Sequence, residues 1–332
     1  MSTAANQSAD ISSAAVSPTA PESSRAGIPW QVKFLTLAVI WGSSFLFMKV
    51  GLAALHPIQI ATARILLAAA VLVILARVTR SRLPRGRRVW AHIFVSSIFL
   101  TALPFTGFVL GETRVASAIA GIGNATTPIA TVVMTLLLLP AQRPTREKLF
   151  AVALGFCGVI VIAEPWNAGG RPDPIGFLIV VLSGCCYGVG WTYNRRFLAD
   201  ADLGGLAQPT AMMLCGSVIM VPVALIWWLI ERPEVAAPWS LQPGNQPYPV
   251  WAGLLCVLAL GVVGTGLAYL LQYDVVRAAG AVVSTTVTYL IPVVSVLLGV
   301  LVLGEHIGAA QLGGFAIVLL AAVLVSRTPK RA

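Results

Sequence analysis

The chain has 332 residues, of which 58% are hydrophobic and 10% are charged, and its mean hydropathy is +0.87. Soluble domains carry about 25% charged residues, so this composition excludes a soluble globular protein and indicates an integral membrane protein. The formal net charge of +10 does not indicate nucleic-acid binding. Basic residues in short loops between apolar helices are typical of cytoplasmic loops that face anionic lipid.

Residues 1–29 are rich in Ser, Ala and Pro and lack the basic and apolar regions of a signal peptide, so we expect a disordered cytoplasmic tail. After this tail come ten apolar runs, and a hydrocarbon core of about 30 Å needs about 20 residues per helix. The expected membrane helices are Val32–Leu52, Ile58–Ala76, Trp90–Leu110, Val115–Leu139, Leu149–Ala163, Ile175–Asn194, Leu206–Ile230, Val250–Tyr273, Ala278–Leu303 and Ala309–Ser326. The long loop that follows Ile230 is rich in proline, so we expect it to form an extended surface strap.

The distribution of basic residues predicts the orientation in the membrane, because Lys and Arg accumulate in cytoplasmic loops. With the N-terminus inside, 17 of the 22 Lys and Arg residues fall on the cytoplasmic side, three fall outside, and Lys49 and Arg64 lie within helices. We therefore expect a multi-pass protein of the inner or plasma membrane with both termini in the cytoplasm.

The two halves of the chain, residues 30–164 and 174–327, resemble each other. Aligning LAVIWGSSFLFMKVGLA with LSGCCYGVGWTYNRRFLA places Gly42 on Gly188 and Lys49 on Arg195, and a second alignment places Pro128 on Pro292. Because each half has five expected helices, the second half enters the membrane from the opposite side. The sequence therefore predicts an all-α fold of ten transmembrane helices in two inverted five-helix repeats, which is a transporter architecture.

The segment WGSSFLFMKVGL with the following ARILLAAA helix, and the segment YLIPVVSVLLGVLVLGEHIGAAQLGGFAIVLLAAVLV, resemble the drug/metabolite transporter superfamily. The resemblance is to its ten-helix EamA type and extends from about Trp30 to Arg327. It implies secondary transport, often export, of metabolites, amino acids or drugs across the inner membrane. The first-half counterpart of LGEHIG is LLPAQRPT, so Glu305 lacks the symmetric glutamate that the family usually has.

Charged residues near the helix ends suggest two gates. We expect an outer cluster of Lys49, Arg64 and Glu112, with Glu305 as another candidate partner of Arg64, and an inner cluster of Arg195, Arg196 and Asp274. Each cluster would be salt-bridged when its side is closed. Two alternatives stay open: Lys49 extends to the outer interface, and Arg64, about six residues or roughly 9 Å inside its helix, forms only a structural ion pair.

Polar and aromatic residues within the expected helices predict a substrate cavity, because lipid-facing positions do not favour them. Helix packing is the alternative for each of them. The candidate substrate-binding residues are Trp41, Ser44, Arg64, Asn124, Tyr187, Trp191, Tyr269, Gln272 and Thr288. Pro128 and Pro292 are candidate helix breaks that would free backbone carbonyls at the cavity.

The sequence predicts neither catalytic residues nor a cofactor or metal site. It has no P-loop, no HExxH motif and no pair of acidic motifs for Mg²⁺, and its five cysteines lie in apolar runs without CxxC spacing. The leading hypothesis is a secondary transporter that exports a small metabolite, amino acid or drug-like compound. The alternatives are a lipid or carrier-lipid flippase and an intramembrane lipid-modifying enzyme.

The expected partners are a small-molecule substrate and membrane lipids, and the fold also allows a homodimer. A coupling proton would need Glu112, Asp274 or Glu305, because all twelve acidic residues lie at expected helix ends or in loops. Facilitated diffusion or exchange stays open as the alternative.

Overall fold

The computed structural model describes residues 28–138, 146–164, 172–201, 203–231, 235–242, 247–285 and 287–326. The expected N-terminal tail lies outside this part of the chain except for Ile28 and Pro29. Most of the LLPAQRPT segment also lies outside it. The same holds for the following basic residues used to predict the orientation: Arg25, Arg143, Arg171, Arg232, Arg327, Lys330 and Arg331.

All regular secondary structure in the described ranges is helical, as expected. The helices are α1 (Trp30–Gly51), α2 (Pro57–Val78), α3 (Arg87–Ser97), α4 (Leu103–Glu112), α5 (Ser117–Asn124), α6 (Thr127–Leu138), α7 (Arg146–Ala163), α8 (Pro174–Phe197), α9 (Ala207–Glu231), α10 (Val250–Gly261), α11 (Ala268–Thr285), α12 (Val287–Leu303) and α13 (Ala309–Ser326). Two π-helical segments, η1 (Ile98–Ala102) and η2 (Val262–Leu267), connect α3 to α4 and α10 to α11.

Seven of the described helical stretches are long and apolar enough to cross a membrane, and three shorter apolar helices accompany them. The seven are Trp30–Gly51, Pro57–Val78, Arg87–Glu112, Ser117–Leu138, Pro174–Phe197, Ala207–Glu231 and Val250–Ala279, and the shorter ones are Leu149–Ala163, Val287–Leu303 and Ala309–Leu324. The expected membrane class is therefore confirmed. The count of ten membrane helices stays a prediction.

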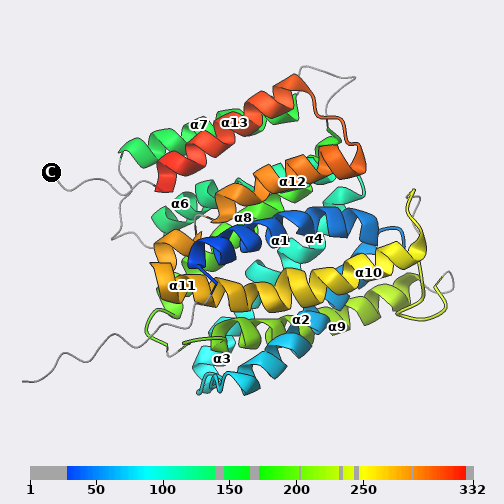
Figure 1. Ribbon diagram of the computed structural model, residues 1–332, viewed down its shortest axis with the longest axis vertical. Helices are drawn as coiled ribbons and strands as arrows, with labels where there is room; N and C mark the ends of the chain where they lie inside the picture. The colour runs from blue at the N-terminus through cyan, green and yellow to red at the C-terminus, as the bar shows by residue number, and fades with distance from the viewer. Residues whose placement is uncertain are drawn as a thin grey trace, which may run out of the picture.

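The helices pack as one bundle, and several pairs of neighbouring helices combine one helix from each half of the chain (Figure 1). Helices α7 and α13 pair at one edge of the bundle, and α2 and α9 pair at the other. Between these edges, α1 packs on α12 and α8 packs on α6, so each contact joins residues far apart in the sequence. We call the ends of the bundle the Gly51 end and the Trp30 end, after the last and first residues of α1.

Small residues that the two halves share allow these close contacts. A Cβ atom on Gly42 would lie 2.4 Å from the Cβ atom of Val294, and one on Gly188 would lie 2.7 Å from the Cβ atom of Ala130. Ala130 and Val294 lie 164 residues apart, the same separation as Pro128 and Pro292. Equivalent glycines therefore contact equivalent positions, where they let two helix backbones approach each other.

Several expected helix boundaries were wrong. The expected helix Val115–Leu139 is interrupted at residues 125–126, and Pro128 lies in the first turn of α6, where proline costs no helical hydrogen bond. The expected break between Tyr273 and Ala278 is also wrong, because α11 is helical from Ala268 through Arg277 to Thr285; residue 286 lies outside the described residues. This stretch of α11 contains no proline, so nothing in it forces the helix to end at Arg277.

The loop expected to be an extended strap is held down on the Gly51 end. The Nε2 atom of Gln59 donates to the carbonyl oxygens of Pro238 and Ser240, 2.9 Å away in each case. The backbone N–H of Gln242 donates to the carbonyl oxygen of Ala54 at 2.8 Å. These contacts satisfy buried polar groups at the α1–α2 turn and fix residues 235–242 over it.

Candidate functional site

A central cavity of about 120 Å³ lies among helices from both halves of the chain. Eight of the nine expected substrate-binding residues line it: Trp41, Ser44, Arg64, Asn124, Tyr187, Trp191, Tyr269 and Thr288. Gln272 lies on α11 but is not part of the wall. Sequence reasoning did not single out the other lining residues: Phe45, Met48, Leu100, Phe105, Phe108, Thr127, Gly264, Thr265 and Ile291.

Arg64 is the charged residue of the cavity wall and is only 7% exposed. Its Nε atom donates a hydrogen bond to the Oγ1 atom of Thr265 at 2.9 Å, and its Cζ atom lies 3.7 Å from the centroid of the Phe105 ring. Within the described residues, no carboxylate oxygen lies within 4.0 Å of the guanidinium nitrogens. The expected ion pairs of Arg64 with Glu112 or Glu305 are therefore absent from this part of the chain.

The π-helical segment η2 positions Thr265 for this contact. The Oγ1 atom of Thr265 donates to the carbonyl oxygen of Leu260 at 3.0 Å, and its remaining lone pairs can accept from Arg64. The corresponding threonine of η1 is Thr101, which lies 164 residues before Thr265. Its Oγ1 atom faces Gly216 instead of an arginine, since a Cβ atom added to Gly216 would lie 2.8 Å from it. Thr265 therefore contacts a guanidinium and Thr101 does not, so the two halves differ at this position. π-Helical segments are frequent at functional sites.

Aromatic rings form much of the remaining wall. Trp41 and Tyr269 meet edge to face with ring centroids 6.3 Å apart, and Phe108 stacks on Tyr187 at 6.0 Å. Ser44, Asn124 and Thr288 add hydroxyl and amide groups to the lining. The cavity thus combines one cation, a few neutral hydrogen-bonding groups and several aromatic surfaces, which is a common composition for small-molecule sites.

Lys49 and Glu112 lie close together at the Gly51 end, but their side chains form no ion pair in the described structure. The Lys49 Nζ atom donates to the backbone carbonyl oxygens of Glu112 and Val115, at 2.7 and 3.0 Å. The extension of Lys49 to the outer interface stays a prediction. Lys49 binds the carbonyl of Glu112 at the end of α4, where helix carbonyls carry partial negative charge, and the carbonyl of Val115 in the turn that follows.

Glu112 is completely buried, and neither carboxylate oxygen has a hydrogen-bond partner among the described residues. The carboxylate interacts electrostatically with Lys49, Glu305 and Arg64. The outer cluster therefore brings its charges together without the salt bridges that we expected.

Glu305 binds the start of α5 and not Arg64. Its carboxylate accepts hydrogen bonds from the backbone N–H groups of Ser117 and Ala118, at 2.7 and 3.0 Å, and from the Ser117 hydroxyl at 3.0 Å. Glu305 thus satisfies two of the free N–H groups of a helix N-terminus. A carboxylate is favoured there by the helix dipole.

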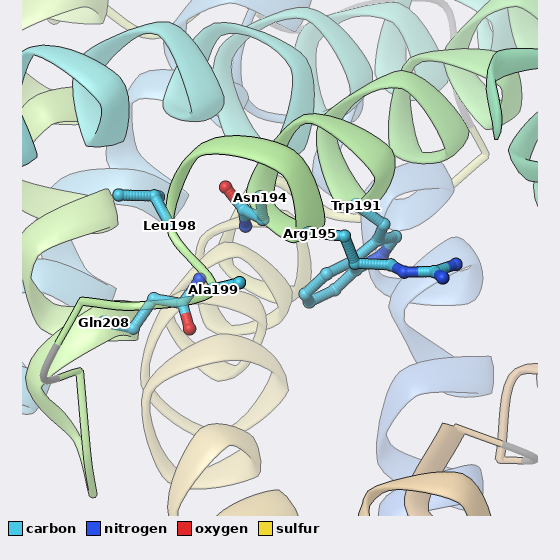
Figure 2. Close-up of a pocket in the computed structure, with 6 residues that line it drawn as sticks. All are labelled: Trp191, Asn194, Arg195, Leu198, Ala199 and Gln208. Atoms are coloured by element: carbon cyan, nitrogen blue, oxygen red, sulfur yellow. The ribbon is translucent and has the colours of Figure 1, made fainter. Parts of the chain in front are cut away.

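The expected inner cluster of Arg195, Arg196 and Asp274 does not form in the described structure. Asp274 pairs with Lys33 at 2.5 Å, and the Arg196 guanidinium donates to the carbonyl oxygen of Leu138. Arg195 lines a separate pocket of about 380 Å³ with Trp191, Asn194, Leu198, Ala199 and Gln208 (Figure 2). Trp191 also lines the central cavity, so this residue lies between the two.

The two candidate helix breaks differ. The break near Pro128 separates α5 from α6. Pro292 lies inside α12, where proline has no backbone N–H for the helical hydrogen bond to the residue four positions earlier. Thr288 lines the central cavity.

The described structure is an all-helical membrane protein with a polar and aromatic cavity between two similar halves, an arrangement that is typical of membrane transporters. The EamA-like transporter family matches residues 28–163 and again residues 174–327, so the chain belongs to this family. The family resemblance inferred from the sequence is confirmed, and the family is one of transporters rather than enzymes.

Relatives of similar length support this assignment. The chain is 23% identical over 290 residues to the uncharacterized inner membrane transporter YedA of Escherichia coli K12, covering 87% of this chain and 88% of YedA. It is 24% identical over 302 residues to an uncharacterized transporter of Archaeoglobus fulgidus, with 90% and 98% covered. Protein PecM of Dickeya dadantii is 22% identical over 289 residues, with 86% and 88% covered.

A solved crystal structure of a protein shares the fold. It covers 89% of this chain and 96% of its own, with a TM-score of 0.58 and 18% sequence identity.

Proposed function

We propose that this chain is a secondary transporter that exports a small organic anion with an apolar or aromatic portion by alternating access. The observation that carries the proposal is the environment of Arg64. Its guanidinium is buried on the cavity wall and is held by Thr265 and Phe105, with no carboxylate within 4.0 Å in the described ranges. A buried charge is costly without a counter-charge, which the anionic group of a substrate would supply.

The size and lining of the cavity favour a small metabolite over a drug-like compound. Pockets for drug-sized ligands hold about 300–1,000 Å³, whereas this cavity holds about 120 Å³. The aromatic rings of Trp41, Tyr187 and Tyr269 would contact the apolar portion of the substrate. Ser44, Asn124 and Thr288 would orient its polar groups.

The proposed architecture is ten membrane helices in two inverted five-helix repeats, with both termini in the cytoplasm. The equivalent contacts Gly42 to Val294 and Gly188 to Ala130 support the repeat. The positive charge of the expected cytoplasmic loops supports the orientation. The name of the E. coli relative supports placement in the inner membrane.

Thermal stabilisation of the purified protein in mild detergent tests the proposal. A ligand at 100 times its dissociation constant adds about 2.7 kcal/mol to the free energy of unfolding. We expect small carboxylates with an apolar group to stabilise the wild-type protein and to lose this effect in Arg64→Gln. Arg114→Gln is the control, because Arg114 is exposed and pairs with Asp173.

Stabilisation only by cations would overturn the proposal, and stabilisation only by lipids would favour the flippase. Chemical conversion of an added lipid by the purified protein would favour the lipid-modifying enzyme.

A further inference from the structure

The amide of Asn124 on the cavity wall has no partner in the described part of the chain. Asn124 is the last residue of α5, it is only 7% exposed, and it lines the central cavity. Its side chain makes no hydrogen bond with the other described residues. Buried amides without a partner are uncommon, because their polar atoms lose hydrogen bonds to water without compensation. The amide is therefore available to a ligand in the cavity.

The chain around Asn124 is fixed against α8. The Oγ1 atom of Thr127 donates to the carbonyl oxygen of Gly184 at 3.0 Å, and a Cβ atom on Gly184 would lie 2.5 Å from the carbonyl oxygen of Gly123. The position that corresponds to Asn124 in the second half, 164 residues later, is Thr288, which also lines the cavity. Both halves thus present a polar side chain to the cavity from this position.

Two hydroxyl groups of the wall already donate their protons to the backbone. The Oγ atom of Ser44 donates to the carbonyl oxygen of Ile40 at 3.2 Å, and the Oγ1 atom of Thr265 donates to that of Leu260 at 3.0 Å. A carbonyl oxygen of a ligand needs a donor, which these hydroxyls do not offer. The Nδ2 atom of Asn124 carries two N–H groups that can supply it.

The charge of the wall sets a second condition on the ligand. None of the described residues that line the cavity is acidic, whereas Arg64 is positive. The α-ammonium group of an amino acid would add a second positive charge without a counter-charge, and a buried charge of this kind is costly. A neutral oxygen adds no charge and can accept from the amide of Asn124.

We propose that the central cavity selects 2-oxo acids over amino acids of the same carbon skeleton, with Arg64 binding the carboxylate and the Asn124 amide donating to the 2-oxo oxygen. The inference rests on the proposed function and adds the class of substrate to it. A short substrate with a single apolar portion carries its polar groups at one end, so the oxygen that Asn124 binds stands next to the carboxylate.

Three ligands with one carbon skeleton test this selection. They are 4-methyl-2-oxopentanoate, 4-methylpentanoate and L-leucine, which differ only in the group on the carbon next to the carboxylate. Thermal titration of the purified protein in mild detergent compares their dissociation constants. We expect the oxo acid to bind about 3- to 10-fold more tightly than 4-methylpentanoate, which is the gain from one neutral hydrogen bond. It should bind at least about 100-fold more tightly than L-leucine.

Asn124→Leu keeps the approximate size of the side chain and removes its polar groups. This variant should bind the oxo acid no more tightly than 4-methylpentanoate, whose own affinity should change by less than about twofold, because it makes no hydrogen bond to the amide. The matched control is Asn194→Leu. Asn194 is also 7% exposed, but it lines the separate pocket of Figure 2 and not the central cavity. The control should keep the wild-type ratio of the two affinities.

Asn124→Asp provides a second variant, because aspartate has the size of asparagine and places a carboxylate in the wall. It should bind L-leucine more tightly and the oxo acid more weakly than the wild-type protein does, since the ammonium group gains a counter-charge and the carboxylate of each acid is repelled. The melting temperature of each variant without ligand shows whether it is folded.

The outcomes distinguish this inference from the proposed function. Equal affinities of the wild-type protein for the oxo acid and 4-methylpentanoate, both dependent on Arg64, would overturn the role of Asn124 and leave the anion site standing. An equal loss of affinity for both ligands in Asn124→Leu would do the same, because it would indicate a structural role. Tighter wild-type binding of L-leucine than of the oxo acid would overturn the selection. Binding of the oxo acid that does not need Arg64, or no binding at all, would contradict both proposals.

Discussion

The Nε atom of Arg64 donates a hydrogen bond to the Oγ1 atom of Thr265 across 2.9 Å, and this contact joins the two halves of the chain at the cavity wall. The position of Thr265 depends on the π-helical segment η2. The corresponding threonine of η1, Thr101, instead faces Gly216. The cavity wall is thus asymmetric although its scaffold is repeated.

Replacing Thr265 should weaken anion binding without removing the charge. A hydrogen bond to a charged group contributes about 1.5–3 kcal/mol, so Thr265→Val should lower the affinity for a bound carboxylate by about 10- to 100-fold. Thr265→Ser should retain most of the affinity, because the hydroxyl remains. Thr101→Val is the matched control, and an equal loss in this variant would show that the effect is not specific to Arg64. Thermal titration with the carboxylate measures all three.

Glu305 should contribute to stability through the start of α5. Its carboxylate accepts two backbone N–H groups and one hydroxyl, so Glu305→Ala should lower the free energy of unfolding by about 1–2 kcal/mol. Glu147→Gln, at an exposed site, should change it by less than about 0.5 kcal/mol. Unfolding in detergent at neutral pH gives both values, and an unchanged stability of Glu305→Ala would contradict the capping role.

His56 should make stability depend on pH. Burial lowers the pKa of the His56 imidazole, and the nearby Glu231 opposes this shift only partly. The neutral ring accepts a hydrogen bond from the Ile58 N–H and stacks on Trp227, with ring centroids 4.4 Å apart. Its contribution is therefore complete above the unfolded pKa of about 6.5 and is lost as the pH falls through the lower folded pKa.

The measurement for His56 is the difference in melting temperature between the wild-type protein and His56→Gln across this pH range. The wild-type protein should lose more stability on acidification than the variant. A difference that does not change with pH would show that His56 does not titrate in this way.

Gly188 should be sensitive to a single added methyl group. A Cβ atom at this position would lie 2.7 Å from the backbone nitrogen of Thr131, which cannot move without shifting α6. Gly188→Ala should therefore destabilise the protein by about 1–3 kcal/mol. The control is Gly313→Ala in α13, where nothing lies within 4 Å and alanine should stabilise the helix by up to about 1 kcal/mol. Equal melting temperatures for the two variants would contradict this packing.

Much of the cavity wall could be predicted from the sequence. Trp41, Asn124 and Tyr187 lie within apolar helices, where lipid does not favour polar or amphipathic side chains. The simplest expectation was therefore that all three side chains face one cavity inside the bundle. Gln272 belongs to the same pattern but lies further along α11, away from the wall. The apolar lining residues, such as Phe105 and Met48, carry no such signal, because lipid and cavity accept them equally.

The charge pairings could not be predicted, because they depend on which helix ends meet in space. Lys33 and Asp274 are 241 positions apart and come together only in the folded bundle. Glu305 binds backbone N–H groups at the start of α5, and such partners have no side-chain pattern in the sequence. The π-helical segments have no composition signature either. The sequence does hold a hint for Thr265: Thr101 lies 164 residues before it, the same separation as between Pro128 and Pro292.

The most direct test of the anion anchor is counterflow in sealed proteoliposomes. Vesicles loaded with unlabelled 4-methyl-2-oxopentanoate, a small apolar carboxylate that stays ionised and crosses lipid slowly, take up the labelled compound through the protein, which requires transport and not binding alone. We expect uptake through the wild-type protein and through Arg114→Gln, and at least a tenfold slower rate through Arg64→Gln. Equal uptake through the wild-type protein and Arg64→Gln would contradict the assignment of Arg64 as the substrate anchor.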